Sequence, residues 1–199
     1  MVSLMQRRRE MMLAASAPQS DLLYSLYNET VQTGDTIETG IAVLQQGRSV
    51  SIVLDFNQTI SNPTTNGANA SIYKLLDVTS GGLRVLTIGK YSRSNSTVQI
   101  WWYSTANNNY TLVTSSTCSA GRKRFVITHA ADSDDITLYS RMATSARQTQ
   151  TLTKTFVATN STLRLGVGDT TQTLPGGVIN KLEVYNRILT TDEINAVFA

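Results

Sequence analysis

The chain has 199 residues, of which 41% are hydrophobic and 16% are charged. That length supports one sizeable core and is short for two, so we expect a single domain with a terminal arm. The formal net charge is only +3, and the Arg7-Arg8-Arg9 cluster contributes much of it, so the body of the protein is close to neutral. Because a nucleic-acid-binding body normally carries a basic face, the composition argues against a nucleic-acid partner.

Cysteine content and hydropathy exclude two further classes. Cys118 is the single cysteine, which rules out an intrachain disulfide and therefore a disulfide-stapled scaffold. We expect this side chain to be buried and inert rather than a reactive thiol. No apolar run approaches the ~20 residues that a bilayer-spanning helix requires, so no membrane span is expected.

Residues 1–19 are interpreted as an N-terminal helical arm, with a short helix over residues 3–16 that Pro18 ends. Methionines tend to one side of this helix and arginines to the other, which suits an arm that inserts into a groove of a partner subunit. The alternative is a helix that packs on its own domain. The residues expected to anchor the arm are Arg7, Arg8, Arg9, Met11 and Met12.

From residue 20 onward the pattern predicts short strands with almost no helix between them. The first strand is expected to use Leu22, Leu23, Leu26 and Tyr27 as apolar anchors. Residues 49–56 alternate apolar and polar side chains, which predicts a half-buried antiparallel strand. Further strands are expected at residues 38–44, 72–76, 83–88, 97–103, 110–115, 124–129, 136–140, 151–157 and 163–167. Strands in this number indicate a two-sheet sandwich rather than a βαβ protein.

The expected strand at residues 97–103 is rich in aromatic side chains. Alternation assigns Ile100 and Trp102 to one face and Trp101 and Tyr103 to the other, so both faces cannot be core unless one is covered. An exposed pair beside amide side chains would suit sugar recognition. The alternative is that Trp101 and Tyr103 pack under a terminal helix or at a subunit contact. The candidate glycan-binding residues are Trp101, Tyr103, Asn107, Asn108 and Tyr110.

Side chains able to carry chemistry are sparse. Asp132, Asp134 and Asp135 cluster at an expected hairpin tip, where a solvated turn is favoured over a calcium site. His129 is the sole histidine, and we expect a partly buried structural residue rather than half of a dyad with Cys118. No zinc-ligand cluster, phosphate loop or nucleophile elbow is present. The sequence therefore predicts no catalytic residue, no metal site and no cofactor.

The end of the chain predicts a strand followed by a helix. Residues 178–185 place Ile179, Leu182 and Val184 on a buried face, with a one-residue slip that indicates a bulge. A capping box between Thr190 and Glu193 starts a short helix at Thr190. The helix residues Ile194, Val197 and Phe198 form an apolar face that must lie on a sheet.

The closing motif Gly177-x-Ile179-Asn180-x-Leu182-x-Val184-Tyr185-Asn186-Arg187-x-Leu189-Thr190-x-x-Glu193-Ile194 resembles the end of concanavalin A-like lectin/glucanase domains of the laminin-G-like type. Residues 39–41, 125–128 and 136–139 are similar to other strands of that family. The resemblance implies an all-β fold, an antiparallel two-sheet jelly-roll sandwich over residues 20–199 with a short C-terminal helix. The carboxylate-bearing strand of the hydrolases in this fold is missing, and Asn180 stands where the family often has an acidic residue, so we do not expect an enzyme.

Taken with the N-terminal arm, this fold suggests a structural or adhesion component of a large assembly. Arg- and Met-rich leaders resemble those of appendage proteins in tailed bacteriophages. The hypothesis is a homo-oligomer in the virion, anchored to other subunits through residues 1–17 and displaying its sandwich toward a surface glycan. The alternative is a free carbohydrate-binding lectin module, or an accessory domain of a glycan-active enzyme, in an extracellular or secreted bacterial setting.

Overall fold

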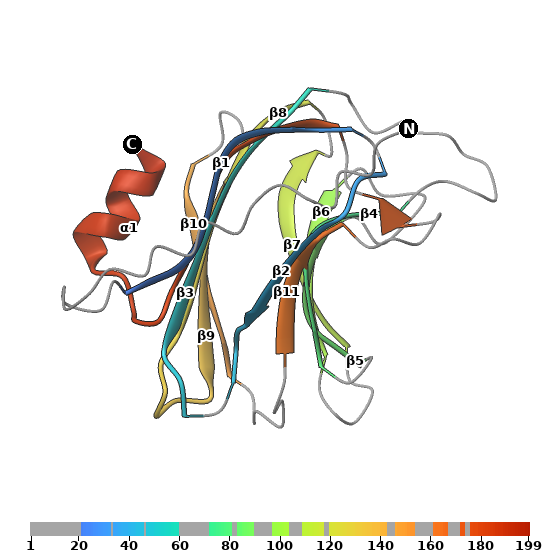
Figure 1. Cartoon of the computed structure of the whole chain (residues 1–199). Helices are drawn as coiled ribbons and strands as arrows, with labels where there is room; N and C mark the ends of the chain where they lie inside the picture. The colour runs from blue at the N-terminus through green and yellow to red at the C-terminus, as the bar shows by residue number, and fades with distance from the viewer. Residues whose placement is uncertain are drawn as a thin grey trace.

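The described residues form two antiparallel sheets stacked face to face, with one short helix outside them (Figure 1). The computed structural model describes residues 21–32, 34–45, 47–59, 72–80, 83–89, 97–103, 109–117, 120–142, 146–153, 161–166, 172–173 and 176–199. The helix expected at residues 3–16 lies outside these ranges, as do its anchor residues. Within them, the predicted all-β sandwich with a C-terminal helix is confirmed.

The first sheet has six strands, whose order differs from their order in the chain. From one edge to the other they are β1 (Leu22–Val31), β13 (Gly177–Tyr185), β3 (Val50–Gln58), β8 (Gly121–His129), β9 (Asp135–Met142) and β10 (Gln148–Thr153). The last strand of the chain is therefore inserted between the first and the third. This arrangement makes the chain's two ends depend on each other for pairing.

The second sheet has seven strands. Its path is β2 (Ile37–Ala42), β11 (Ser161–Leu165), β4 (Ile72–Ser80), β5 (Leu83–Gly89), β6 (Thr97–Tyr103) and β7 (Asn109–Thr117), with β12 (Gln172–Thr173) paired in parallel to β4. The aromatic segment thus forms β6, between β5 and β7.

The hydrophobic core fills the space between the two sheets. Side chains from the six-stranded sheet and from the seven-stranded sheet are buried there together. Members with at most 1% exposure include Ile52, Leu54, Phe56, Phe125, Ile127, Ile179, Leu182 and Val184 on one side and Leu86, Ile88, Leu163 and Leu165 on the other.

The bulge expected in the last strand is confirmed. The register of β13 against β3 slips between Ile179 and Lys181, so Ile179 on one side of the slip and Leu182 and Val184 on the other all face the core. A strand with a strict two-residue alternation would have turned one of these sets toward the outside.

Two expectations about individual strands are wrong. Strand β3 is buried on both faces rather than half-buried, because its outer residue Val53 packs with Val126 under the C-terminal helix. On β1, Leu23 and Tyr27 are 45% and 47% exposed rather than anchors. The reason is that β1 is an edge strand whose register shifts between Leu22 and Tyr24.

The C-terminal helix α1 (Thr191–Phe198) begins as the sequence predicts, with Thr190 as N-cap and a capping box to Glu193. The helix lies on the outer side of the six-stranded sheet (Figure 1). Its buried residues Ile194 and Phe198 cluster with Val53 and Val126 of that sheet. Among the described residues no helix is long and apolar enough to cross a membrane.

Replacing Gly177 with alanine should destabilise the fold. A Cβ at this buried position would meet the carbonyl oxygen of Asn57 and the ring of Phe56, and overpacking of this kind costs about 1–3 kcal/mol. Urea unfolding of the Gly177→Ala variant measures the loss. Thr30→Ala, an exposed change on the neighbouring strand β1, serves as control. An unchanged free energy of unfolding in Gly177→Ala would contradict the tight packing of β13 against β3.

Candidate functional site

The register of the seven-stranded sheet places the aromatic residues of β6 on two faces. Leu86 and Ile88 are buried in the core, and they pair with Trp102 and Ile100 of β6. Because directly opposed residues in antiparallel strands share a face, Trp102 and Ile100 occupy core-side positions. The intervening residue Trp101 therefore occupies a position on the outer face.

A row of outer-face positions crosses the sheet at the level of Trp101. Each member is paired with the next in the strand registers: Glu38, Arg164, Asp77, Thr87, Trp101 and Thr111. Within the row Arg164 Nη1 lies 3.7 Å from Glu38 Oε1. Two residues from Trp101 along β6, Tyr103 pairs with Asn109. Two aromatic positions thus stand beside hydroxyl, amide and charged residues on the face that points away from the core.

The structure brings together part of the candidate glycan-binding set. Trp101 and Tyr103 share the outer face, whereas Tyr110 pairs with Trp102 and so belongs to the core-side row. The register separates Tyr110 from the other two aromatic residues, which alternation within a single strand could not reveal. Asn107 and Asn108 lie outside the described residues, as does Cys118.

The outer face of the other sheet is occupied by α1. Val53 and Val126 of the sheet form a second apolar cluster with Leu189, Ile194 and Phe198. The sequence left open that Trp101 and Tyr103 pack under a terminal helix. The C-terminal helix covers β3 and β8 and does not cover β6. Trp101 and Tyr103 belong to β6. Strand β6 is in the seven-stranded sheet, and α1 lies on the other sheet (Figure 1).

Two arginines of the sheet hold the C-terminal end of α1. Arg124 Nη1 donates to the carbonyl oxygens of Val197 and Ala199 at 3.0 and 2.7 Å, and Arg141 Nη1 donates to that of Phe198 at 2.6 Å. These bonds satisfy carbonyls that lack partners within the helix and place positive charge at its negative end. Burial, followed by the charges of Arg122 and Arg141, lowers the pKa of Arg124.

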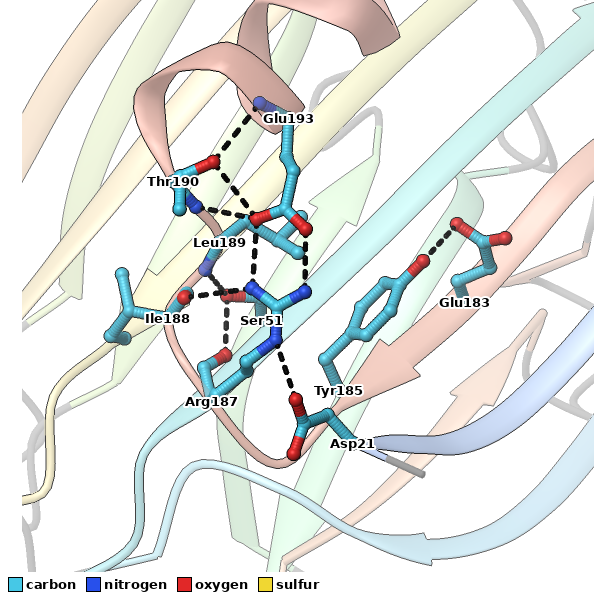
Figure 2. Close-up of polar contacts among 9 residues, drawn as sticks. All are labelled: Asp21, Ser51, Glu183, Tyr185, Arg187, Ile188, Leu189, Thr190 and Glu193. Carbon is cyan, nitrogen blue, oxygen red and sulfur yellow. Dashed lines mark hydrogen bonds and ion pairs between the residues drawn. The ribbon is translucent and has the colours of Figure 1, made fainter. Parts of the chain in front are cut away.

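At the other end of α1, the Arg187 guanidinium links the helix to Asp21, the residue just before β1 (Figure 2). Its Nη1 and Nη2 donate to the two carboxylate oxygens of Glu193 at 2.7 and 2.5 Å, while its Nε donates to Asp21 Oδ2 at 2.9 Å. The same Glu193 carboxylate accepts from the backbone N–H of Thr190 at 2.7 Å. Paired hydrogen bonds of this kind are stronger than single ones.

The turn before α1 is tied to β3 through one buried hydroxyl, that of Ser51 (Figure 2). Ser51 Oγ donates to the carbonyl of Arg187 at 2.8 Å and accepts from the N–H of Leu189 at 2.9 Å. A buried backbone donor and a backbone acceptor are both satisfied by this side chain. The entry to α1 is therefore fixed in position relative to the sheet.

Sequence reasoning missed two buried carboxylates on this sheet. Asp55, 5% exposed, accepts from Arg122 Nη2 at 2.5 Å and from Asn180 Nδ2 at 3.1 Å. The side-chain amide of Asn180 thus donates a hydrogen bond to Asp55 and does not form a carboxylate pair with it. No local signal could have shown this, because the partners of Asp55 lie 67 and 125 residues away.

The second of these carboxylates belongs to Glu183, which is 6% exposed. It accepts hydrogen bonds from the hydroxyls of Tyr27 and Tyr185, the latter at 2.8 Å, and Lys181 Nζ lies 3.5 Å away. The hydrogen bond to Glu183 raises the pKa of Tyr27 to about 12. The carboxylate therefore orients two tyrosines.

The sole histidine and the aspartate cluster occupy structural positions. His129 is 1% exposed, and its Nδ1 and Nε2 lie 3.1 and 3.0 Å from the carbonyl oxygens of Arg48 and Ser133. The turn between β8 and β9 carries Asp132 and Asp134, both exposed. In the part of the chain that the structure describes, no three His, Cys, Asp or Glu side chains are grouped so as to hold a metal ion.

Comparison with known proteins relates the chain by fold. No protein-family model matches the sequence, and no curated protein matches it. Among solved structures, the sialidase CBM40 of Ruminococcus gnavus bound to alpha2,6 sialyllactose has a TM-score of 0.58 at 16% identity, over 88% of this chain and 98% of that one. The leech intramolecular trans-sialidase has a TM-score of 0.55 at 17% identity, over 88% of this chain and 27% of that one. At these identities the likeness shows the fold, a β-sandwich of the lectin-like kind.

The assembly hypothesis stays a prediction. It depends on Arg7, Arg8, Arg9, Met11 and Met12, which lie outside the described residues. The comparisons with solved structures concern the fold alone. They do not test a virion setting, attachment to other subunits or a secreted bacterial setting.

Acid should weaken the attachment of α1. The pKa of Glu193 falls from 4.5 to about 2, mainly because of its hydrogen bonds with Arg187 and then with the backbone of Thr190. A carboxylate with a depressed pKa contributes stability that is fully present above its unfolded pKa, here near 4.5, and is lost as the pH falls toward about 2. We expect the thermal unfolding midpoint to fall through this window. The midpoint of Glu193→Gln should start lower at neutral pH and fall less.

The control for this test is Asp192→Asn, which removes an exposed carboxylate from the same first turn. Its midpoint should follow the wild-type acid dependence. If Glu193→Gln loses as much stability on acidification as the wild type does, the Arg187–Glu193 pair is not the acid-sensitive attachment.

Proposed function

We propose that this protein is a non-enzymatic, lectin-like module that binds a glycan on the outer face of its seven-stranded sheet. One observation carries the proposal: the registers assign Trp101 and Tyr103 to outer-face positions on the sheet that α1 does not cover. Large aromatic residues are usually buried, so two of them on the outer face of a sheet favour a role in binding.

The chemistry of the neighbouring positions suits a sugar. An aromatic ring stacks on the apolar C–H face of a pyranose, while hydroxyl and amide groups exchange hydrogen bonds with its hydroxyls. Thr87 and Thr111 pair with Trp101 on either side, and Asn109 pairs with Tyr103. A shallow site on a rigid sheet also avoids the cost of ordering loops when the ligand binds.

The fold comparisons support the same class of function. The matching Ruminococcus gnavus module is a carbohydrate-binding module solved with sialyllactose, and it matches over nearly its whole length. This supports a sugar ligand for the present chain without selecting which sugar. The lectin-like alternative is therefore favoured over the virion hypothesis as the function to test first.

The two buried carboxylates, Asp55 and Glu183, have structural partners and are not arranged for hydrolysis. Glycoside hydrolysis requires an acid and a base or nucleophile that face each other across the scissile bond. Asp55 is held by Arg122 and Asn180, and Glu183 is held by two tyrosines. Both acidic groups stabilise the sheet that carries α1, on the opposite side of the sandwich from Trp101.

The test is a glycan array followed by titration of the best glycan into the protein in solution. Both tryptophans of the chain lie in β6, so intrinsic tryptophan fluorescence reports on this strand alone. We expect selective binding that changes the emission. The Trp101→Ala variant should bind about tenfold or more weakly, since truncating an aromatic residue at the centre of an interface typically costs about 2 kcal/mol.

The matched control is Ile188→Ala, which truncates an exposed apolar side chain near α1 and should leave affinity unchanged. Circular dichroism of both variants checks that they are folded. The absence of binding to any glycan by the wild type, or full affinity in folded Trp101→Ala, would contradict the proposal.

A further inference from the structure

Four arginines gather around the C-terminal end of α1, on the outer side of the six-stranded sheet. Arg122 and Arg124 belong to β8, Arg141 belongs to β9, and Arg147 immediately precedes β10. Arg124 and Arg141 are directly opposed in the register and both donate to carbonyl oxygens at the end of the helix. The guanidinium of Arg147 lies 5.7 Å from the centroid of the Phe198 ring. We call these four side chains the arginine cluster.

The arginine cluster carries more positive charge than its neighbours balance. In the part of the chain that the structure describes, the one carboxylate bonded to it is that of Asp55, which pairs with Arg122. The other three arginines contact uncharged groups, namely backbone carbonyls, the side-chain oxygen of Asn195 and aromatic rings.

The size of this excess indicates what could balance it. A helix C-terminus carries about half a negative charge, so four guanidinium groups, one carboxylate and the end of α1 leave about two and a half positive charges. A carboxylate at Ala199, whose carbonyl oxygen lies 2.7 Å from Arg124 Nη1, would still leave about one and a half.

Two features at the centre of the cluster cost stability without an anion. Like charges that face each other directly across a sheet repel, and Arg124 is only 7% exposed, so water screens it poorly. Burial, and then the charges of Arg122 and Arg141, lowers the pKa of Arg124. In addition, the buried Nε of Arg141 has no hydrogen-bond partner among the described residues. An anion that accepts from these groups would relieve both costs.

The cluster is accessible from the side of Arg122. This residue is two positions from Arg124 along β8, hence on the same face of the sheet, and its side chain is 52% exposed. Asp55 accepts from Nε and Nη2 of Arg122, so this carboxylate does not engage Nη1. An ion from solvent can therefore reach the cluster past the end of α1.

We propose that the arginine cluster binds a doubly charged oxyanion, a phosphate or sulfate group, on the sheet just past the C-terminal end of α1. The planar guanidinium group donates paired hydrogen bonds to such an anion. A phosphate group carries a charge of about −1.5 to −2 at neutral pH, which matches the excess better than a single carboxylate does. The site is on the opposite sheet from Trp101 and does not depend on the proposed glycan site.

NMR of the full-length protein labelled with ¹⁵N tests the site directly, because arginine Nε–H groups give individual signals. Inorganic phosphate is titrated at neutral pH, with chloride exchanged to keep the ionic strength constant. We expect saturable shifts of the Nε signals of Arg124 and Arg141. The Nε signal of Arg187, which donates to Asp21 at 2.9 Å, is the internal control and should not move.

Calorimetric titration of phosphate into variants provides the second measurement. Arg122→Gln should weaken binding about tenfold or more, because it removes a charged donor from the open side of the site. Arg48→Gln is the matched control: it removes the same charge from an exposed side chain in the connection between β2 and β3, and its affinity should be unchanged. Circular dichroism checks that both variants are folded.

Further anions define the chemistry of the ligand. Sulfate should bind as phosphate does, and acetate, with a single charge, more weakly. Tighter binding of glycerol phosphate than of inorganic phosphate would assign the site to an esterified group, and the reverse order would assign it to the free ion.

The proposal is overturned if the Arg124 and Arg141 signals shift without saturation, or no more than that of Arg187. Equal phosphate affinity in folded Arg122→Gln and Arg48→Gln would overturn it as well. None of these outcomes bears on glycan binding, which the Trp101 variants test separately.

Discussion

The six-stranded sheet is apolar on both faces at its centre, and this constraint determines the rest of the architecture. Strand β3 alternates Ile52, Leu54 and Phe56 toward one side with Val53 toward the other, and all four are buried. Burial of a sheet on both faces requires a cover on each. The seven-stranded sheet supplies the inner cover and α1 supplies the outer one, so one side of the sandwich is closed.

Because α1 covers the outer face of the six-stranded sheet, binding is expected on the outer face of the seven-stranded sheet. The polar contacts at the two ends of α1, through Arg187 and Ser51 at its start and through Arg124 and Arg141 at its end, hold the helix over Val53 and Val126. The seven-stranded sheet has the complementary pattern, with an apolar inner row and an outer row of polar and aromatic positions. The proposed recognition surface and the face that α1 covers are thus on opposite sides of the sandwich.

The sequence predicted what depends on local pattern. Alternation located the strands, the one-residue slip between Ile179 and Leu182 indicated the bulge, and the capping box of Thr190 and Glu193 located α1. It could not predict contacts between distant strands. The burial of both faces of β3, the enclosure of Asp55 by Arg122 and Asn180, and the exposure of Tyr27 at an edge all follow from strand order. For the same reason, the placement of Tyr110 apart from Trp101 required the register of β7 against β6.

The central claim is that alternate residues of β6 lie on the core side and on a face open to ligands. Collisional quenching of tryptophan fluorescence by iodide measures this most directly, since the chain has two tryptophans and both are in β6. In the Trp102→Phe variant, which keeps Trp101, the account predicts strong quenching in the free protein and protection when glycan is bound. In Trp101→Phe, which keeps Trp102, it predicts weak quenching. Equal protection of both tryptophans in the free protein would contradict the account.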